Sequence, residues 1–153
     1  MVLENKVLKL EPFKEEDFDY LYGLINENKY NKFNEKLVKK AIRLTGHLFW
    51  RLIAKEKKLG VVYTSYYSDT DRYYLDGYRD DDSVRNITNK ISFSKEAGNL
   101  VTNYMLDHFT DVMWTSHEIE NRAATILCKR MGYQVHEVTD SIVGKMITLK
   151  KEK

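Results

Sequence analysis

Three side chains in the last third of the chain have the chemistry for acid–base catalysis, and a fourth lies farther back. His117 and Glu118 are neighbours in a polar stretch, and either could act as a general base that takes a proton from a nucleophile. Cys128 carries the chain's single thiol, which could donate a proton to a leaving group. Asp76 is another candidate base. The alternative for His117 is an ordinary exposed residue at a strand end, and for Cys128 a small core residue.

The stretch 111–133 predicts the elements that must position these side chains. Val112–Thr115 is an apolar, β-prone run without alternation, which is typical of a strand covered on both faces. The polar residues 117–120 are expected to end that strand. Asn121 is a good N-cap for a short helix, and Gly132 is a typical helix stop.

This order of a strand, an asparagine, small residues, a basic residue, a glycine and an aromatic residue resembles the last motif of the GNAT superfamily of N-acetyltransferases. The residues that carry the resemblance are Asn121, Ala124, Leu127, Arg130, Gly132 and Tyr133. Many members of that family have a tyrosine four residues before the glycine, where this chain has Cys128. The branch of ribosomal-protein amino-terminal acetyltransferases often lacks that tyrosine, so the chain is similar to this branch.

The resemblance and the order of the predicted elements imply a single domain over residues 1–153 with an α+β fold in three layers. We expect a mixed, mostly antiparallel sheet of about six to seven strands, with one parallel crossover at a V-shaped splay and about four helices on both faces.

Hydrophobic periodicity places most of these elements along the chain. The expected strands are 7–11, 47–54, 61–67, 72–79 and a closing hairpin of 133–139 with 142–150. The expected helices are 14–26, a second one capped by Asn34, and a third one capped by Ser94. We expect a loop up to Ser92, with Ile91 and Phe93 forming a further strand turn. In the strand 72–79, Tyr74, Asp76 and Tyr78 should share one face.

The resemblance implies acetyl-coenzyme A as co-substrate, bound where the third helix begins and along the splay. Its pyrophosphate would meet residues 92–98, which depart from the glycine-rich pattern of the family. The coenzyme contacts expected on this chain are Tyr78, Ser94, Lys95, Ala97, Gly98, Asn121 and Ala124. The candidate catalytic residues are His117, Glu118 and Cys128. The alternative for residues 92–98 is an ordinary serine-capped helix start.

Composition narrows the class of protein and of partner. The 153 residues include one proline, 42% hydrophobic and 31% charged residues, enough for one domain with a core. The net charge of +2 comes from interspersed charges, which argues against a nucleic-acid or membrane partner. One cysteine and no paired histidine motif predict no disulfide and no metal. We expect a cytoplasmic monomer or homodimer acting on a small-molecule or protein amine.

Two other functions stay open at the level of sequence. A catalytically inactive relative that binds a partner protein would explain the missing glycine-rich loop and the missing tyrosine. An enzyme that acylates a nucleotide or a nucleic-acid base would use the six tyrosines of the predicted strands for stacking. These are Tyr63, Tyr66, Tyr67, Tyr73, Tyr74 and Tyr78. The same tyrosines are also what a half-buried sheet favours.

Overall fold

The computed structural model describes residues 1–27, 48–54, 57–84, 90–142 and 144–153. Its elements are β1 (Leu3–Glu4), β2 (Lys9–Pro12), the 3₁₀ helix η1 (Glu15–Asp17), α1 (Phe18–Glu27), β3 (Leu48–Ala54), β4 (Lys57–Tyr67), β5 (Arg72–Arg79), α3 (Lys90–His108), β6 (Val112–Glu118), α4 (Arg122–Arg130), β7 (Gln134–Ser141) and β8 (Gly144–Glu152). The strands form one sheet in the order β1-β2-β3-β4-β5-β6-β8-β7. The predicted α+β class is confirmed, with eight strands instead of six or seven.

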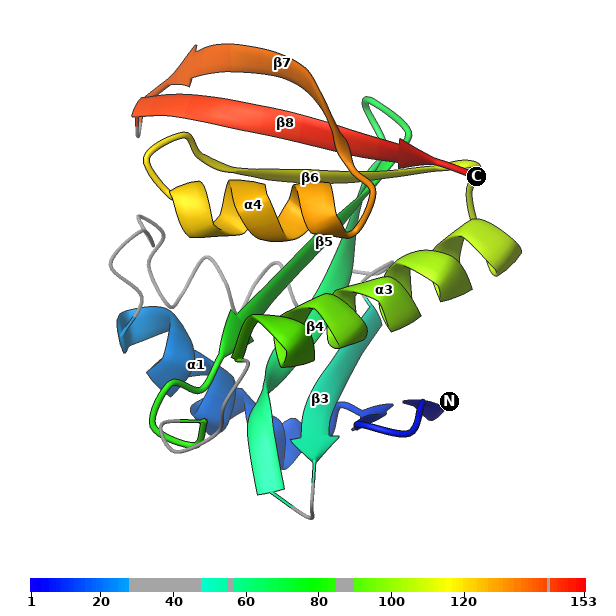
Figure 1. Cartoon of the computed structure of the whole chain (residues 1–153), viewed down its shortest axis with the longest axis vertical. Coiled ribbons are helices and arrows are strands. Elements are labelled where there is room, and N and C mark those ends of the chain that lie inside the picture. Colours follow the sequence, from blue (N-terminus) through cyan, green and yellow to red (C-terminus); the bar gives the residue numbers. More distant parts are fainter. Residues whose placement is uncertain (28–47, 55–56, 85–89, 143) are drawn as a thin grey trace.

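The parallel pair β5–β6 is the irregular place in this sheet. All other neighbouring strands are antiparallel. Strands β5 and β6 pair at two positions, Tyr73 with Met113 and Tyr74 with Trp114. Beyond these residues the two strands diverge toward their carboxyl ends (Figure 1). The chain therefore has the V-shaped splay that was predicted.

Helices cover both faces of the sheet, around two clusters of apolar side chains. The larger cluster lies under α3 and α4 and includes Val101, Met105 and Leu149. The smaller cluster joins Leu21 and Ile25 of α1 to β4 on the other face. We call these the α3/α4 face and the α1 face. The two faces of the sheet at the splay therefore carry different side chains.

Two predicted boundaries are wrong. Helix α3 begins at Lys90, so Ser94 is not its N-cap, and Ile91 and Phe93 are helical and form no strand turn. Strand β6 does not end before His117 but continues to Glu118, which pairs with Met146 of β8. Polar residues do not end this strand, because its backbone hydrogen bonds to β8 continue. The helix predicted to begin at Asn34 lies outside the described residues.

The short helix α4 begins and ends as predicted. Asn121 is its N-cap, and its Oδ1 accepts a hydrogen bond from the Ala124 N–H at 3.2 Å. The helix stops before Gly132, which has a φ of +89°, a conformation that glycine adopts at low cost. Cys128 and Met131 pack into the larger cluster. Helix α4 is therefore held at a fixed position beside β6.

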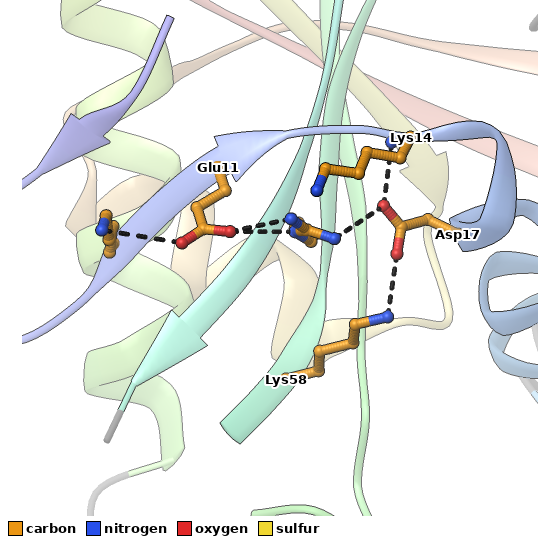
Figure 2. A network of polar contacts seen from close by, with 6 residues as sticks. Glu11, Lys14, Asp17 and Lys58 are labelled. Atoms are coloured by element: carbon orange, nitrogen blue, oxygen red, sulfur yellow. Dashed lines mark hydrogen bonds and ion pairs between the residues drawn. The ribbon is translucent and has the colours of Figure 1, made fainter. Parts of the chain in front are cut away.

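A buried charge network fixes the start of α1 to the sheet (Figure 2). Asp17 is fully buried, and its Oδ1 lies 2.8 Å from Lys58 Nζ of β4. Its Oδ2 accepts hydrogen bonds from Arg51 Nη1 of β3 at 3.3 Å and from the Lys14 N–H at 2.9 Å. Arg51 also pairs with Glu11 of β2 at 2.9 Å. The network therefore ties three strands to the turn that enters α1.

No helix in the described part of the chain is long and apolar enough to cross a membrane.

Candidate active site

The register of the strands shows which side chains lie together at the splay. On β5, Tyr74 lies opposite Trp114 of β6, so both share the α1 face. Strand geometry places Asp76 and Tyr78 on this same face, as predicted for β5. It likewise places Glu118 on the α1 face of β6. The α1 face of the splay therefore carries two carboxylates, one from each diverging strand.

Asp76 is the carboxylate on β5. Tyr63 of β4 lies directly opposite, and its O–H donates to Asp76 Oδ2 at 3.1 Å. The Gly77 N–H donates to Oδ1 at 2.8 Å. Burial raises the pKa of Asp76 to about 6, although both hydrogen bonds lower it. Asp76 is nevertheless exposed to solvent. Such a group can exchange a proton near neutral pH.

Two tyrosines flank Asp76. The rings of Tyr63 and Tyr78 are stacked, with centroids 6.4 Å apart and an interplanar angle of 19°. Burial is the main cause that raises the pKa of both phenols above the usual value. Both tyrosines therefore stay protonated at neutral pH and can donate hydrogen bonds. Tyr78, a predicted coenzyme contact, packs with the smaller cluster on the α1 face.

The α3/α4 face of the splay carries a different set of groups. The Thr115 hydroxyl of β6 donates to the Leu75 carbonyl of β5 at 3.1 Å, just beyond the last paired residues. Cys128 of α4 lies beside Thr115 and is buried. Burial raises the pKa of the Cys128 thiol to about 11, and a hydrogen bond with Thr115 offsets only part of the shift. The thiol is therefore protonated at neutral pH and is a core residue as well as a candidate acid.

His117 and Glu118 lie on opposite faces of β6. His117 shares its face with Thr115, and its Nε2 lies 2.7 Å from Thr125 Oγ1 of α4. Burial lowers the pKa of His117, so its ring is neutral at pH 7. Glu118 lies on the α1 face, the face that also carries Asp76 of β5. The two neighbours in sequence therefore cannot act on the same atom from one side.

The predicted phosphate-binding residues lie inside α3 instead of at its start. Because α3 begins at Lys90, Ser94 and Lys95 are in its second turn and are half-buried. Ala97 is buried in the larger cluster. A Cβ on Gly98 would collide with Met131 Sδ unless that side chain moved, so α3 and α4 approach each other closely there. Packing thus explains both small residues without a ligand.

Asn121 and Ala124 are half-buried at the amino end of α4, as the motif required. Sequence reasoning named Asp76 but missed its partner Tyr63 and the hydroxyls of Thr115 and Thr125. The tyrosine could have been found only by knowing the register of β4 against β5. Among the described residues, no group of three or more histidine, cysteine, aspartate or glutamate side chains is placed to hold a metal ion.

Comparison with known proteins gives likenesses in structure. No family model matches the sequence, and no curated protein matches it. The ribosomal L7/L12 alpha-N-protein acetyltransferase in complex with coenzyme A has a TM-score of 0.76 and 10% identity over 99% of this chain and 98% of that one. The microcin C7 self-immunity acetyltransferase in complex with acetyl-CoA and AMP has a TM-score of 0.73 and 17% identity, over 97% of this chain and 94% of that one. A mutant of spermidine N-acetyltransferase from Vibrio cholerae has a TM-score of 0.75 and 12% identity, over 97% of this chain and 95% of that one.

Proposed function

We propose that this chain, which has the fold of the GNAT-family acetyltransferases, transfers an acetyl group from acetyl-coenzyme A to a primary amine. The observation that carries the proposal is the splay between β5 and β6, with a proton-exchanging carboxylate on one face and the capped amino end of α4 beside the other. Three structural neighbours bind coenzyme A or acetyl-CoA, or act on an amine, by their own descriptions.

The splay fits an extended thioester cofactor. Beyond Tyr74 and Trp114 the facing edges of β5 and β6 no longer pair with each other. Backbone groups left unpaired need partners, and the amides of a pantetheine chain supply them. Asn121 and Ala124 would contact the coenzyme at the amino end of α4, with Ser94 and Lys95 of α3 as further contacts. Ala97, Gly98 and Tyr78 would shape the site through packing.

The reaction that we propose is direct attack in a ternary complex. When bound, the coenzyme supplies an activated acetyl thioester. Asp76 would take a proton from the ammonium form of the acceptor, directly or through a water, so that the neutral amine attacks the thioester carbonyl. Its pKa of about 6 suits a base at neutral pH. As the C–N bond forms, the C–S bond would break, and the sulfur would leave as a thiolate that takes a proton from water. Cys128 is kept as a candidate donor to the sulfur, although burial raises the pKa of its thiol to about 11 and makes it a weak acid. Holding the two reactants together supplies most of the rate enhancement.

His117 takes a supporting part in this proposal. It lies on the α4 side with Thr125, away from Asp76. A neutral ring that is hydrogen-bonded to a hydroxyl of α4 positions β6 against that helix. We therefore assign the base to Asp76 and keep His117 as a candidate for proton transfer on the coenzyme side. We further propose a cytoplasmic enzyme whose acceptor is a small molecule or a protein amino group.

Thermal unfolding with and without acetyl-coenzyme A tests the cofactor. A ligand at a hundred times its Kd stabilises the folded state by about 2.7 kcal/mol, an upward Tm shift of about 5 °C or more for a domain of this size. We expect that shift with acetyl-coenzyme A, and none with adenosine at the same concentration. An unchanged Tm would contradict the proposal and favour the inactive, protein-binding alternative.

A further inference from the structure

Glu118, the last residue of β6, is buried, and one oxygen of its carboxylate has no hydrogen-bond partner. The residue is 9% exposed, and its Oε1 is buried with no hydrogen-bond partner. No ion pair joins Glu118 to a cation of the described residues. Burying an unpaired charge costs several kcal/mol in general. An unpaired buried oxygen of this kind calls for a partner from outside the described residues, and a bound ligand is one source.

The surroundings of Glu118 on the α1 face favour a cationic ligand. Of the cations beside the two splayed strands, Arg72 of β5 lies at the closed end, where it stacks on the Trp114 ring at 3.7 Å, and Lys150 of β8 lies 5.8 Å from the same ring. Arg51 and Lys58, also on the α1 face, are paired with Asp17. The open end carries Asp76 and Glu118 instead. Among the described side chains that β5 and β6 place on the α1 face, the positive charge is therefore at the closed end and the two carboxylates are at the open end.

The distance between the two carboxylates fits an elongated molecule. Asp76 is two residues beyond the last paired position of β5, and Glu118 is four residues beyond that of β6. At a rise of about 3.3 Å per residue, Glu118 lies about 7 Å farther along the splay, before the divergence of the strands is added. One amine at Asp76 and a second cation at Glu118 would be separated by a spacer of about five bonds or more.

We propose that Glu118 binds a second cationic group of the acceptor, so that the substrate is an amine carrying another positive charge several bonds from the reacting nitrogen. This inference rests on the proposed acetyl transfer. The second cation comes either from a small diamine or from a basic side chain following the amino terminus of a peptide. In both cases the Glu118 carboxylate acts as a specificity residue and takes no proton in the reaction.

Matched acceptors test this inference. Cadaverine and pentylamine have the same carbon chain and differ in the second amine. A peptide amide with lysine as its second residue and its norleucine counterpart make the same comparison for a peptide. We expect kcat/KM to be about tenfold to a hundredfold higher for the dicationic member of one pair, as for a hydrogen bond to a charged group. The pair that shows the preference identifies the source of the cation.

The variant Glu118→Gln should abolish that preference by raising KM for the dicationic acceptor far more than for the monoamine. Glu137→Gln, at an exposed glutamate of β7, is the matched control and should keep the preference. The fold of Glu118→Gln should be at least as stable as the wild type, because an unpaired buried charge is removed. A structural role would lower its stability instead.

Three outcomes would overturn the inference. Equal kcat/KM within both acceptor pairs is one. An equal loss of kcat for the monoamine and the diamine in Glu118→Gln is another, since it would make Glu118 the base. The third is measured without turnover: cadaverine should raise the Tm of the wild type more than pentylamine does, and no difference would refute the site. Failure of acetyl transfer itself would show separately, as no coenzyme-dependent Tm shift and no acetylated amine.

Discussion

Strand geometry divides side chains that are neighbours in the sequence between two faces, and the roles that we propose for them follow this division. His117 faces α4 and is neutral, whereas Glu118 faces the α1 side with Asp76. The pKa of Asp76 is raised to about 6, which makes it the group of this site best suited to accept a proton near neutrality. Its alternation with Tyr74 and Tyr78 could be predicted from the sequence. The hydrogen bond that Asp76 accepts from Tyr63 could not be predicted from the sequence, because it depends on the register of β4 against β5.

Replacing Asp76 tests its role as base. Asp76→Asn should lower kcat/KM by about a hundredfold to ten-thousandfold, the usual contribution of a general base. In the wild type, kcat/KM should rise as the pH increases through about 6, where Asp76 ionises, and this limb should be absent in the variant. Asp69→Asn, in the exposed turn before β5, serves as the control. A variant with the same activity and the same pH profile would exclude this role.

The same substitution has an expected effect on stability. The folded-state pKa of Asp76 lies above the ordinary value of 3.8, so ionisation above pH 6 disfavours the folded state. Asp76→Asn should therefore be more stable than the wild type at pH 8, and this gain should vanish at pH 4. Urea unfolding at the two pH values measures it. A loss of stability at pH 8 would mean that the Tyr63 hydrogen bond outweighs the cost of the charge.

At the scale of elements, tertiary packing decided what local sequence could not. Residues 92–98 contain two serines and a glycine, and serine favours a helix cap. They are helical nevertheless, because Phe93, Ala97 and Val101 face the larger cluster at helical spacing. At α4 the local signals and the packing favour the same ends. Asn121 caps the helix and Gly132 follows its last turn, so the predicted ends of α4 are correct.

The charge network under α1 should control the stability of that element. Burial would raise the pKa of Asp17, but hydrogen bonds from Lys58 and Lys14 and the charges of Lys58 and Arg51 lower it overall. The network therefore stabilises the fold above the unfolded pKa of about 3.9, and this stability is lost as the pH falls through the lower folded value.

Asp17→Asn should cost about 3 kcal/mol or more, because it leaves Arg51 buried with less compensation. The variant should also lose stability less steeply than the wild type below pH 5. Asp81→Asn is the control, since its pair with Arg79 is exposed and should contribute less than about 1 kcal/mol. Equal urea midpoints for wild type and Asp17→Asn would refute this anchoring role.

Two glycines should respond in opposite directions to alanine. Gly60 has a φ of +151°, and a Cβ there would collide with the Tyr78 carbonyl oxygen. Gly60→Ala should cost about 2 kcal/mol or more and disturb β5 beside Asp76. Gly23, exposed on α1 with open space around its Cα, should gain about 0.5–1 kcal/mol in Gly23→Ala. Thermal melts of both variants measure this contrast, and the same sign in both would contradict it.

At the scale of the whole molecule, the sheet order and the single parallel crossover bring the site together. Residues of β4, β5, β6 and α4 meet only because β5 and β6 are neighbours that separate again. The overall class followed from the order of the predicted elements, whereas the assignment of each residue to one face needed the strand register. Identities of 10% and 17% with structures of the same fold show how little of the fold depends on particular residues.

The cross-strand tyrosines also find a structural role at this scale. Tyr66 packs on Tyr73 and Tyr67 on Tyr74, with ring centroids 4.7 and 5.2 Å apart. Such pairs stabilise neighbouring strands. Much of the tyrosine-rich meander is therefore explained by the packing of β4 on β5, without a stacked base.

Acetyl transfer to an amine in the presence of the purified protein is the measurement that tests the central claim most directly. The protein is incubated with acetyl-coenzyme A and a panel containing monoamines, diamines and short peptides, and both the free thiol and the acetylated amine are quantified. We predict equal amounts of the two products, with an initial rate in Asp76→Asn at least about a hundredfold lower than in the wild type. No amine-dependent thiol release from the wild type, or equal release by the variant, would contradict the assignment of the splay as the active site.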